Sequence, residues 1–167
     1  MTVPARIALV GFMGSGKSTV GPIVAGCLGW RFFDSDAEIE ARAHSPVSEI
    51  FRARGETYFR ELERQAIGDL LGAEERVIAT GGGAFAQAAC AEDLLSRAFT
   101  VHLSCDFEEA FRRVVFLGGR PLVERGEAEA RALYAERKDK YSRAHVTVDT
   151  TSRSPHDVAA DILRLLP

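Results

Sequence analysis

The sequence predicts an α/β fold in which a parallel β-sheet is covered by helices on both faces. Short apolar segments alternate along the chain with segments of helical periodicity, and strands separated by helices pair in parallel. The chain has 167 residues, of which 46% are hydrophobic and 27% charged, as in a globular domain. No repeat or linker divides it. We therefore expect one domain over residues 1–167, with its helices and sheet in three layers.

Short runs of apolar and β-branched residues are the predicted strands. The first, Arg-Ile-Ala-Leu-Val, is almost wholly apolar, as expected of a strand buried on both faces. In chain order the predicted strands cover residues 6–10, 31–33, 76–80, 99–103 and 145–148.

The helical segments between these strands begin and end at recognisable signals. The helix after the first strand stops at Gly29, and a capping box of Ser35 and Glu38 starts the next one. Within 56–71, apolar residues recur at helical spacing on one face. The predicted helices cover residues 17–28, 35–43, 46–55, 56–71, 106–115, 127–142 and 155–166.

A phosphate-binding loop follows the first strand. Gly11-Phe-Met-Gly14-Ser-Gly16-Lys17-Ser18 fits G-x4-G-K-[S/T] and lies between a predicted strand and a predicted helix. The glycines let backbone N–H groups turn toward an anion, and the helix N-terminus adds partial positive charge. Lys17, the only lysine among the first 137 residues, would reach the β- and γ-phosphates, and the Ser18 hydroxyl would bind Mg²⁺. The loop predicts a nucleoside triphosphate with Mg²⁺.

This loop alone does not separate a kinase from a GTPase or a motor ATPase. No N-K-x-D guanine motif is present, and the third strand runs into three glycines without a Walker B aspartate. The acid beside the metal must come from elsewhere, and Asp34-Ser35-Asp36 follows the second strand. One carboxylate could hold a magnesium-bound water while the other takes or positions a hydroxyl proton. Helix capping explains the same acidic pattern, and the phosphate loop favours the functional interpretation.

Charge and composition limit the classes of partner that we expect. The net charge of −3 argues against a nucleic-acid binder, and no apolar run approaches the roughly 18 residues of a membrane-spanning helix. The start of the chain lacks signal-peptide architecture, so we expect a cytoplasmic protein. Cys27, Cys90 and Cys105 are widely spaced and are predicted to be buried, reduced thiols. We expect small-molecule substrates, no nucleic-acid or membrane partner, and a monomer.

Several motifs together resemble the shikimate kinase family. They are the phosphate loop, the Asp-Ser-Asp, the segment FRARGETYFRELE from Phe51 to Glu63, the glycine run, Arg120-Pro121-Leu122, and the late Arg137 with Tyr141. The resemblance runs in register from about residue 7 to residue 166. It implies a small P-loop kinase with a five-stranded sheet in the order 2-3-1-4-5 and a mobile lid at about 112–125. It also implies transfer of the γ-phosphate of ATP to the 3-hydroxyl of shikimate.

The resemblance further implies roles for single residues. The implied catalytic residues are Asp36, which would hold the shikimate hydroxyls or act as base, Lys17, and the lid residue Arg120. Ser18 and, through water, Asp34 are implied to hold Mg²⁺. The residues implied to bind ATP are Gly11, Met13, Gly14, Ser15, Gly16, Lys17, Ser18, Thr19, Arg113, Arg120 and Arg153, with Arg113 and Arg153 flanking the adenine.

On the acceptor side, Arg60 and Arg137 are implied to grip the shikimate carboxylate, with Glu63 orienting Arg60. Bidentate arginines suit a carboxylate. The residues implied to bind shikimate are Asp36, Arg60, Gly81, Gly82, Gly83, Arg137, Phe51 and Phe59.

Other interpretations stay open. Arg60 could simply pair with Glu56 or Glu63, and Arg137 with Glu136 or Asp139, on a solvated face. A related kinase could act on another hydroxy acid such as gluconate, and a non-enzymatic paralogue could bind nucleotide only.

The approach to the lid departs from the family pattern, because Val114-Val115-Phe116-Leu117 is apolar. Residues 116–126 read as a mobile loop. The apolar run either ends the preceding helix with one face in the core, or places Phe116 or Leu117 to dock on the body when the lid closes.

Overall fold

A computed structural model describes residues 4–117 and 125–167. Five parallel strands form one sheet in the order β2-β3-β1-β4-β5, as the resemblance implied. In the register, Ile7 of β1 lies beside Val77 of β3 and Phe99 of β4. The strands are β1 (Arg6–Val10), β2 (Arg31–Asp34), β3 (Arg76–Ala79), β4 (Phe99–Ser104) and β5 (Val146–Asp149).

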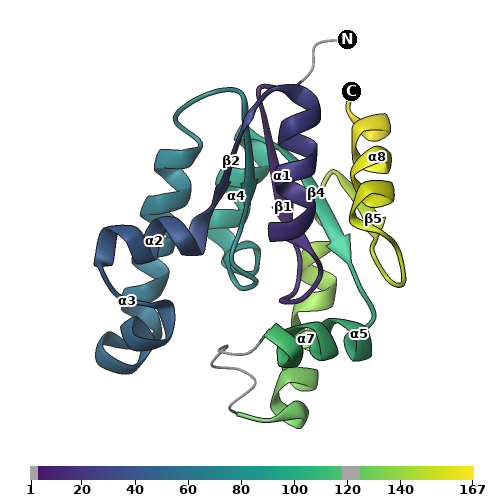
Figure 1. Cartoon of the computed structure of the whole chain (residues 1–167). Coiled ribbons are helices and arrows are strands. Elements are labelled where there is room, and N and C mark those ends of the chain that lie inside the picture. The colour runs from purple at the N-terminus through teal and green to yellow at the C-terminus, as the bar shows by residue number, and fades with distance from the viewer. Residues whose placement is uncertain (1–3, 118–124) are drawn as a thin grey trace.

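Helices cover both faces of this sheet (Figure 1). Helices α1 and α8 pack together on one face, and α3, α4 and α7 contribute to the apolar cluster on the other. The helices are α1 (Lys17–Leu28), α2 (Ser35–Ala43), α3 (Val47–Leu70), the 3₁₀ turn η1 (Ala84–Ala86), α4 (Ala88–Arg97), α5 (Phe107–Leu117), α7 (Glu127–Tyr141) and α8 (Pro155–Leu165).

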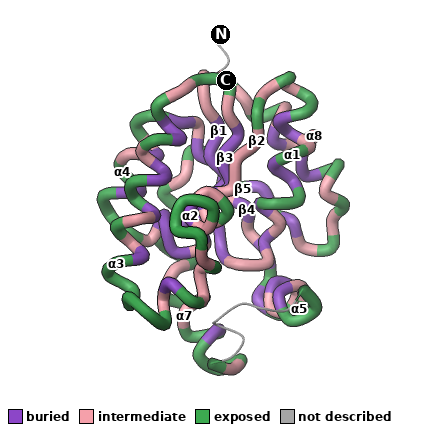
Figure 2. The backbone as a smooth tube through the Cα atoms, turned by 60° about the vertical axis from the view of Figure 1, so that its left-hand side comes forward, coloured by how far each residue is buried: buried purple, intermediate pink, exposed green. Residues whose placement is uncertain are grey.

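Strand β1 lies at the centre of the core and explains the apolar run that opens the chain. Its side chains alternate, so Ile7 and Leu9 belong to the cluster under α1 and α8, while Ala8 and Val10 belong to the opposite cluster. All four are fully buried, and β1 is coloured purple, as buried, in Figure 2. The three-layer α/β prediction is therefore confirmed.

The corner between β2 and α2 differs from the prediction. Asp34 caps α2, because its Oδ1 accepts hydrogen bonds from the backbone N–H of Asp36 at 2.9 Å and of Ala37 at 3.4 Å. Ser35 is fully buried, and its hydroxyl instead accepts a hydrogen bond from the Gly81 backbone at 3.0 Å. The predicted capping box of Ser35 and Glu38 is wrong, and Ser35 ties this corner to the glycine run.

A single glycine breaks the long helix α3. Gly55 has φ 81° and ψ 174°, outside the helical region, so the residues before and after it form two helical segments. This agrees with the two predicted helices 46–55 and 56–71. The break matters for the site, because side chains from both segments face the same hollow.

Other local differences concern segments with weak signals. Helix α4 was not predicted, since alanine-rich residues 84–98 carry no clear start signal. Helix α5 runs on to Leu117, so Phe116 is helical and not part of a loop. Cys27 is exposed rather than buried, whereas Cys90 and Cys105 are buried as expected. None of the helices in the described ranges is long and apolar enough to cross a membrane.

The end of α5 shows where each residue of the apolar run lies. Val114 is 2% exposed and belongs to the core, whereas Phe116 is 90% exposed and Leu117 78%. The run therefore ends α5 with one face in the core, as the first interpretation expected, and Phe116 and Leu117 lie on the exposed side. Docking of Phe116 or Leu117 on the body stays a prediction. Arg120 and half of the predicted lid lie in 118–124, outside the described residues.

Candidate active site

The phosphate loop joins β1 to α1 at the carboxyl edge of the sheet, where ligands bind in open α/β folds. Gly14 and Gly16 have φ of +75° and +101°, which side chains with a Cβ rarely adopt. A Cβ on Gly14 would also lie 2.2 Å from the Ala110 carbonyl oxygen. The buried Lys17 ammonium donates to the Gly11 and Phe12 carbonyls at 2.7 and 2.9 Å, so its charge lies inside the loop.

A residue of α5 and the residue after β5 hold this loop in place. The Thr150 hydroxyl donates to the Ser15 carbonyl at 2.9 Å, and Arg113 donates to the Gly14 carbonyl at 3.1 Å. Arg113 also donates to the Thr150 carbonyl at 3.1 Å and pairs with Glu109. Thr150 was not predicted as a site residue, because no sequence motif marks it.

A cavity of about 280 Å³ lies beside the loop. It brings together five of the residues implied to bind ATP and adds Thr150 and part of α8. Arg153 at its edge is held by Asp161 at 2.6 Å. The lining residues are Ser15, Gly16, Thr19, Val20, Arg113, Thr150, Arg153, Pro155 and Val158.

Two oxygen ligands meet at the start of α1. The Ser18 hydroxyl donates to Asp34 Oδ2 at 2.5 Å, so a hydroxyl and a carboxylate lie side by side next to the phosphate loop. Such hard oxygen donors fit Mg²⁺, which keeps several waters and binds few protein ligands. Across 4–117 and 125–167, no group of three or more His, Cys, Asp or Glu side chains is arranged to hold a metal ion. The pair therefore suits a cation shared with phosphate oxygens.

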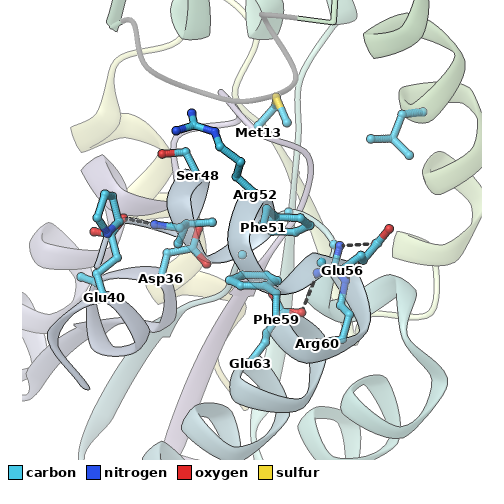
Figure 3. Close-up of a pocket in the computed structure, with 18 of the residues that line it drawn as sticks. Met13, Asp36, Glu40, Ser48, Phe51, Arg52, Glu56, Phe59, Arg60 and Glu63 are labelled. Atoms are coloured by element: carbon cyan, nitrogen blue, oxygen red, sulfur yellow. Dashed lines mark hydrogen bonds and ion pairs between the residues drawn. The ribbon is translucent and has the colours of Figure 1, made fainter. Parts of the chain in front are cut away.

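A larger cavity of about 870 Å³ opens on the other side of the loop (Figure 3). It gathers every residue implied to bind shikimate from α2, α3, the glycine run and α7. Those residues are Asp36, Phe51, Phe59, Arg60, Gly81, Gly82, Gly83 and Arg137. The lining also includes residues that no motif singled out, among them Glu40, Val47, Ser48, Arg125 and Leu133.

Two aromatic rings form an apolar wall of this cavity. Phe51 and Phe59 come from opposite sides of the break at Gly55, and their ring centroids lie 4.5 Å apart. Phe59 is 3% exposed and belongs to a small core cluster with Ile39 and Ile50. The wall suits the carbon face of a small ring, while the polar groups lie around it.

Arg60 is fixed inside the cavity by acidic partners on its own helix. Its guanidinium pairs with Glu63 at 2.6 Å and with Glu56 at 3.2 Å, so both pairings considered from the sequence occur (Figure 3). Burial lowers the pKa of Arg60, but the carboxylates of Glu63 and Glu56 together outweigh it and raise the pKa. A Cβ on Gly83 would lie 2.4 Å from Arg60 Nη2, so only glycine lets the guanidinium lie there.

Two carboxylates lie against the first glycine of the run. A Cβ on Gly81 would fall 2.8 Å from Asp36 Oδ1 and 2.7 Å from Glu63 Oε1. Burial raises the pKa of Glu63, and the ion pair with Arg60 opposes that rise. Asp36 is only partly buried and lines the cavity. The arrangement offers a carboxylate to a hydroxyl of a bound molecule.

Arg137 turns toward the cavity rather than along its helix. Glu136 is paired with Lys140 at 3.2 Å, and Arg137 instead acts electrostatically on Glu63 and Tyr141. A second cation thus joins Arg60 at the cavity. Two guanidinium groups, a carboxylate and an apolar wall can bind a small hydroxylated acid next to a phosphate loop.

Known proteins with the same features are shikimate kinases. The family model described as shikimate kinase matches residues 13–167. A shikimate kinase of Persephonella marina is 39% identical over 95% of this chain and 96% of its own length. The structure of an Acinetobacter baumannii shikimate kinase in complex with shikimate superposes with a TM-score of 0.93, at 40% identity over 98% of this chain and 93% of that chain. An Aquifex aeolicus shikimate kinase structure gives 0.85 at 38% identity, over 95% and 94%.

Proposed function

The chain belongs to the shikimate kinase family, and from this premise we propose how its own residues transfer the γ-phosphoryl group of ATP to the 3-hydroxyl of shikimate. The products are shikimate 3-phosphate and ADP. The observation that carries the proposal is the large cavity beside the phosphate loop, where two arginines and Asp36 surround an aromatic wall. Family membership favours shikimate over gluconate as acceptor, and it favours an enzyme over a nucleotide-binding paralogue.

On the nucleotide side, the phosphate loop and the smaller cavity beside it bind ATP. Lys17 exchanges its hydrogen bonds to the Gly11 and Phe12 carbonyls for the β- and γ-phosphates of ATP. Backbone N–H groups of the loop cradle the phosphates, and the cavity between Arg113 and Arg153 takes the adenine. Ser18, together with Asp34 through water, would hold Mg²⁺. When bound, Mg²⁺ neutralises charge on the β- and γ-phosphates.

The acceptor side orients the attacking hydroxyl. Arg60 and Arg137 bind the shikimate carboxylate, and Phe51 and Phe59 pack on the ring. Asp36 accepts the hydrogen bond of the 3-hydroxyl and takes its proton as the oxygen attacks the γ-phosphorus. The backbone of Gly82 and Gly83 approaches the bound acceptor. Arg120 lies outside the described residues, and its proposed role as a positive group on the transferring phosphate rests on the sequence alone.

We also propose a monomer in the cytoplasm that works on small molecules without nucleic acid or membrane. Support comes from the net charge of −3 and from the three cysteines, all of which are free thiols. Light scattering after size-exclusion chromatography checks the monomer.

A coupled ADP-release assay with shikimate, with gluconate and without acceptor tests the function. We expect rapid ADP release with shikimate only, and a phosphorus NMR spectrum that identifies a monoester at the 3-hydroxyl. Equal rates with gluconate, or an acceptor-independent rate as fast as that with shikimate, would contradict the proposal.

A further inference from the structure

Tyr141 lies under the acceptor cavity, although it is not among the residues that line it. It ends helix α7 and is 2% exposed. Its hydroxyl donates a hydrogen bond to the carbonyl oxygen of Gly82, the middle residue of the glycine run. Gly82 and its two neighbours form part of the cavity lining. One buried side chain therefore fixes the backbone that faces the acceptor.

The Tyr141 side chain also interacts electrostatically with Arg137, one helical turn earlier in α7. Both residues point from one face of the helix, as expected at a spacing of four. Tyr141 thus joins a backbone carbonyl of the glycine run to one of the two cations at the cavity. Burial raises the pKa of Tyr141 to about 12, so the hydroxyl keeps its proton and stays a donor.

The ring of Tyr141 is held in turn by His102. The two rings stack with centroids 5.0 Å apart and an interplanar angle of 24°. His102 belongs to β4 and lies in register with Val10, the residue before the phosphate loop. Burial and the nearby Lys17 charge lower the pKa of His102 to about 4, so it is neutral at pH 7. The stacked pair connects α7 to the central strands.

We propose that Tyr141 is a positioning residue for the acceptor, whose hydroxyl holds the Gly82 carbonyl and the Arg137 guanidinium in fixed relation. The groups that bind shikimate are then already in position, so the entropic cost of ordering them on binding is smaller. This inference rests on the proposed function, because it assigns Tyr141 to the binding of the same acceptor. It concerns shikimate and leaves the nucleotide side unaffected.

Tyr134 provides a matched control on the same helix. Its hydroxyl also donates to a backbone carbonyl, that of Cys105, at 2.8 Å. That carbonyl does not belong to the cavity lining, and neither does Tyr134. Tyr134→Phe and Tyr141→Phe therefore remove the same chemical group from the same helix, and only the second change reaches the acceptor cavity.

The test measures KM for shikimate, KM for ATP, kcat and thermal unfolding in the wild type and both variants. A neutral hydrogen bond contributes about 0.5–1.5 kcal/mol, so we expect Tyr141→Phe to raise KM for shikimate roughly 2- to 13-fold. KM for ATP should stay constant in both variants, and Tyr134→Phe should keep the wild-type KM for shikimate. Unfolding curves confirm that each variant is folded.

Three results would count against the inference. KM for shikimate could be unchanged in Tyr141→Phe, or could rise equally in Tyr134→Phe, or could rise together with KM for ATP. Each indicates a purely structural tyrosine. A wild type that does not phosphorylate shikimate would overturn the proposed function as well, whereas an active wild type with an unaffected Tyr141→Phe overturns only the role of Tyr141.

Discussion

Asp34 and Asp36 are separated by one residue yet face different partners. Asp34 caps α2 through its Oδ1. Its Oδ2 accepts a hydrogen bond from the Ser18 hydroxyl, so its side chain faces the phosphate loop. Asp36 points the other way, toward Gly81 and the acceptor cavity. The strand-to-helix corner produces this division, because the chain direction changes between the two residues. The sequence predicted two acidic residues with separate duties here, but it assigned the cap to Ser35.

Asp36→Asn should keep the fold and lower kcat by about 10²- to 10⁴-fold, because the amide cannot accept the hydroxyl proton. Steady-state rates at saturating shikimate and ATP measure the effect. Glu38→Gln on the same helix, where Glu38 pairs with Arg42 at 3.3 Å, is the control and should stay active. A kcat near the wild-type value in Asp36→Asn would reduce Asp36 to a neighbour of the helix cap.

Lys17→Ala should abolish transfer and weaken ATP binding, because the phosphates lose the ammonium that the loop encloses. Titration calorimetry with ATP and the coupled assay measure both effects. Lys140→Ala removes an exposed lysine that is paired with Glu136, and it should leave both unchanged. Full activity in Lys17→Ala would remove the basis for the phosphate-loop assignment.

Among the helices and strands, periodicity and motif context predicted most of what the structure contains. The five strands were placed to within one residue, because buried parallel strands are apolar runs bounded by charge or glycine. The break at Gly55 was also predicted. Helix α4 was missed, since its buried side chains Cys90, Ala91 and Leu94 are mostly small and give little contrast between faces. The extension of α5 to Leu117 was missed because its last two residues, Phe116 and Leu117, are apolar but exposed. They therefore do not follow the pattern of a helix with apolar residues on its buried face only.

Phe116→Ser should leave the stability of the free enzyme within about 0.5 kcal/mol of wild type, because the ring is 90% exposed. Val114→Ala on the same helix removes buried side-chain atoms, so it should lower the free energy of unfolding more, by about 1.5–3 kcal/mol. Thermal unfolding compares the two. If Phe116 docks on the body during turnover, its variant should also show a lower kcat and more ATP hydrolysis without acceptor. A large stability loss in Phe116→Ser would contradict the exposed position.

The neutral His102 in β4 should make stability depend on pH. Its folded pKa is about 4 against an ordinary 6.5, so between these values the unfolded chain binds a proton that the folded chain does not. Stability should therefore fall as pH drops from 6.5 to 4, and the fall should be smaller in His102→Phe. His156→Gln, at an exposed position of α8, should keep the wild-type slope. Identical slopes in all three proteins would show that His102 carries no such effect.

The molecule places its two cavities on either side of one loop at the carboxyl edge of the sheet. The phosphate loop can be predicted from the sequence alone, because its geometry requires fixed residue types at fixed spacing. The acceptor cavity could be predicted only through family resemblance, since its residues come from α2, α3, the glycine run and α7. Tertiary partners such as Thr150 behind the loop and Leu133 at the cavity have no local signal. Their roles follow from contacts that exist only after folding.

The proposed function depends most on recognition of an acceptor carboxylate in the larger cavity. The direct measurement compares kcat/KM for shikimate and for its methyl ester in the wild type and in Arg137→Ala. Hydrogen bonds to a charged group contribute about 1.5–3 kcal/mol, so the wild type should prefer the acid by about 10- to 150-fold. The variant should lose part of that preference, because Arg60 alone remains to bind the carboxylate. An ester as good as the acid in the wild type, or an equal preference in the variant, would contradict the account.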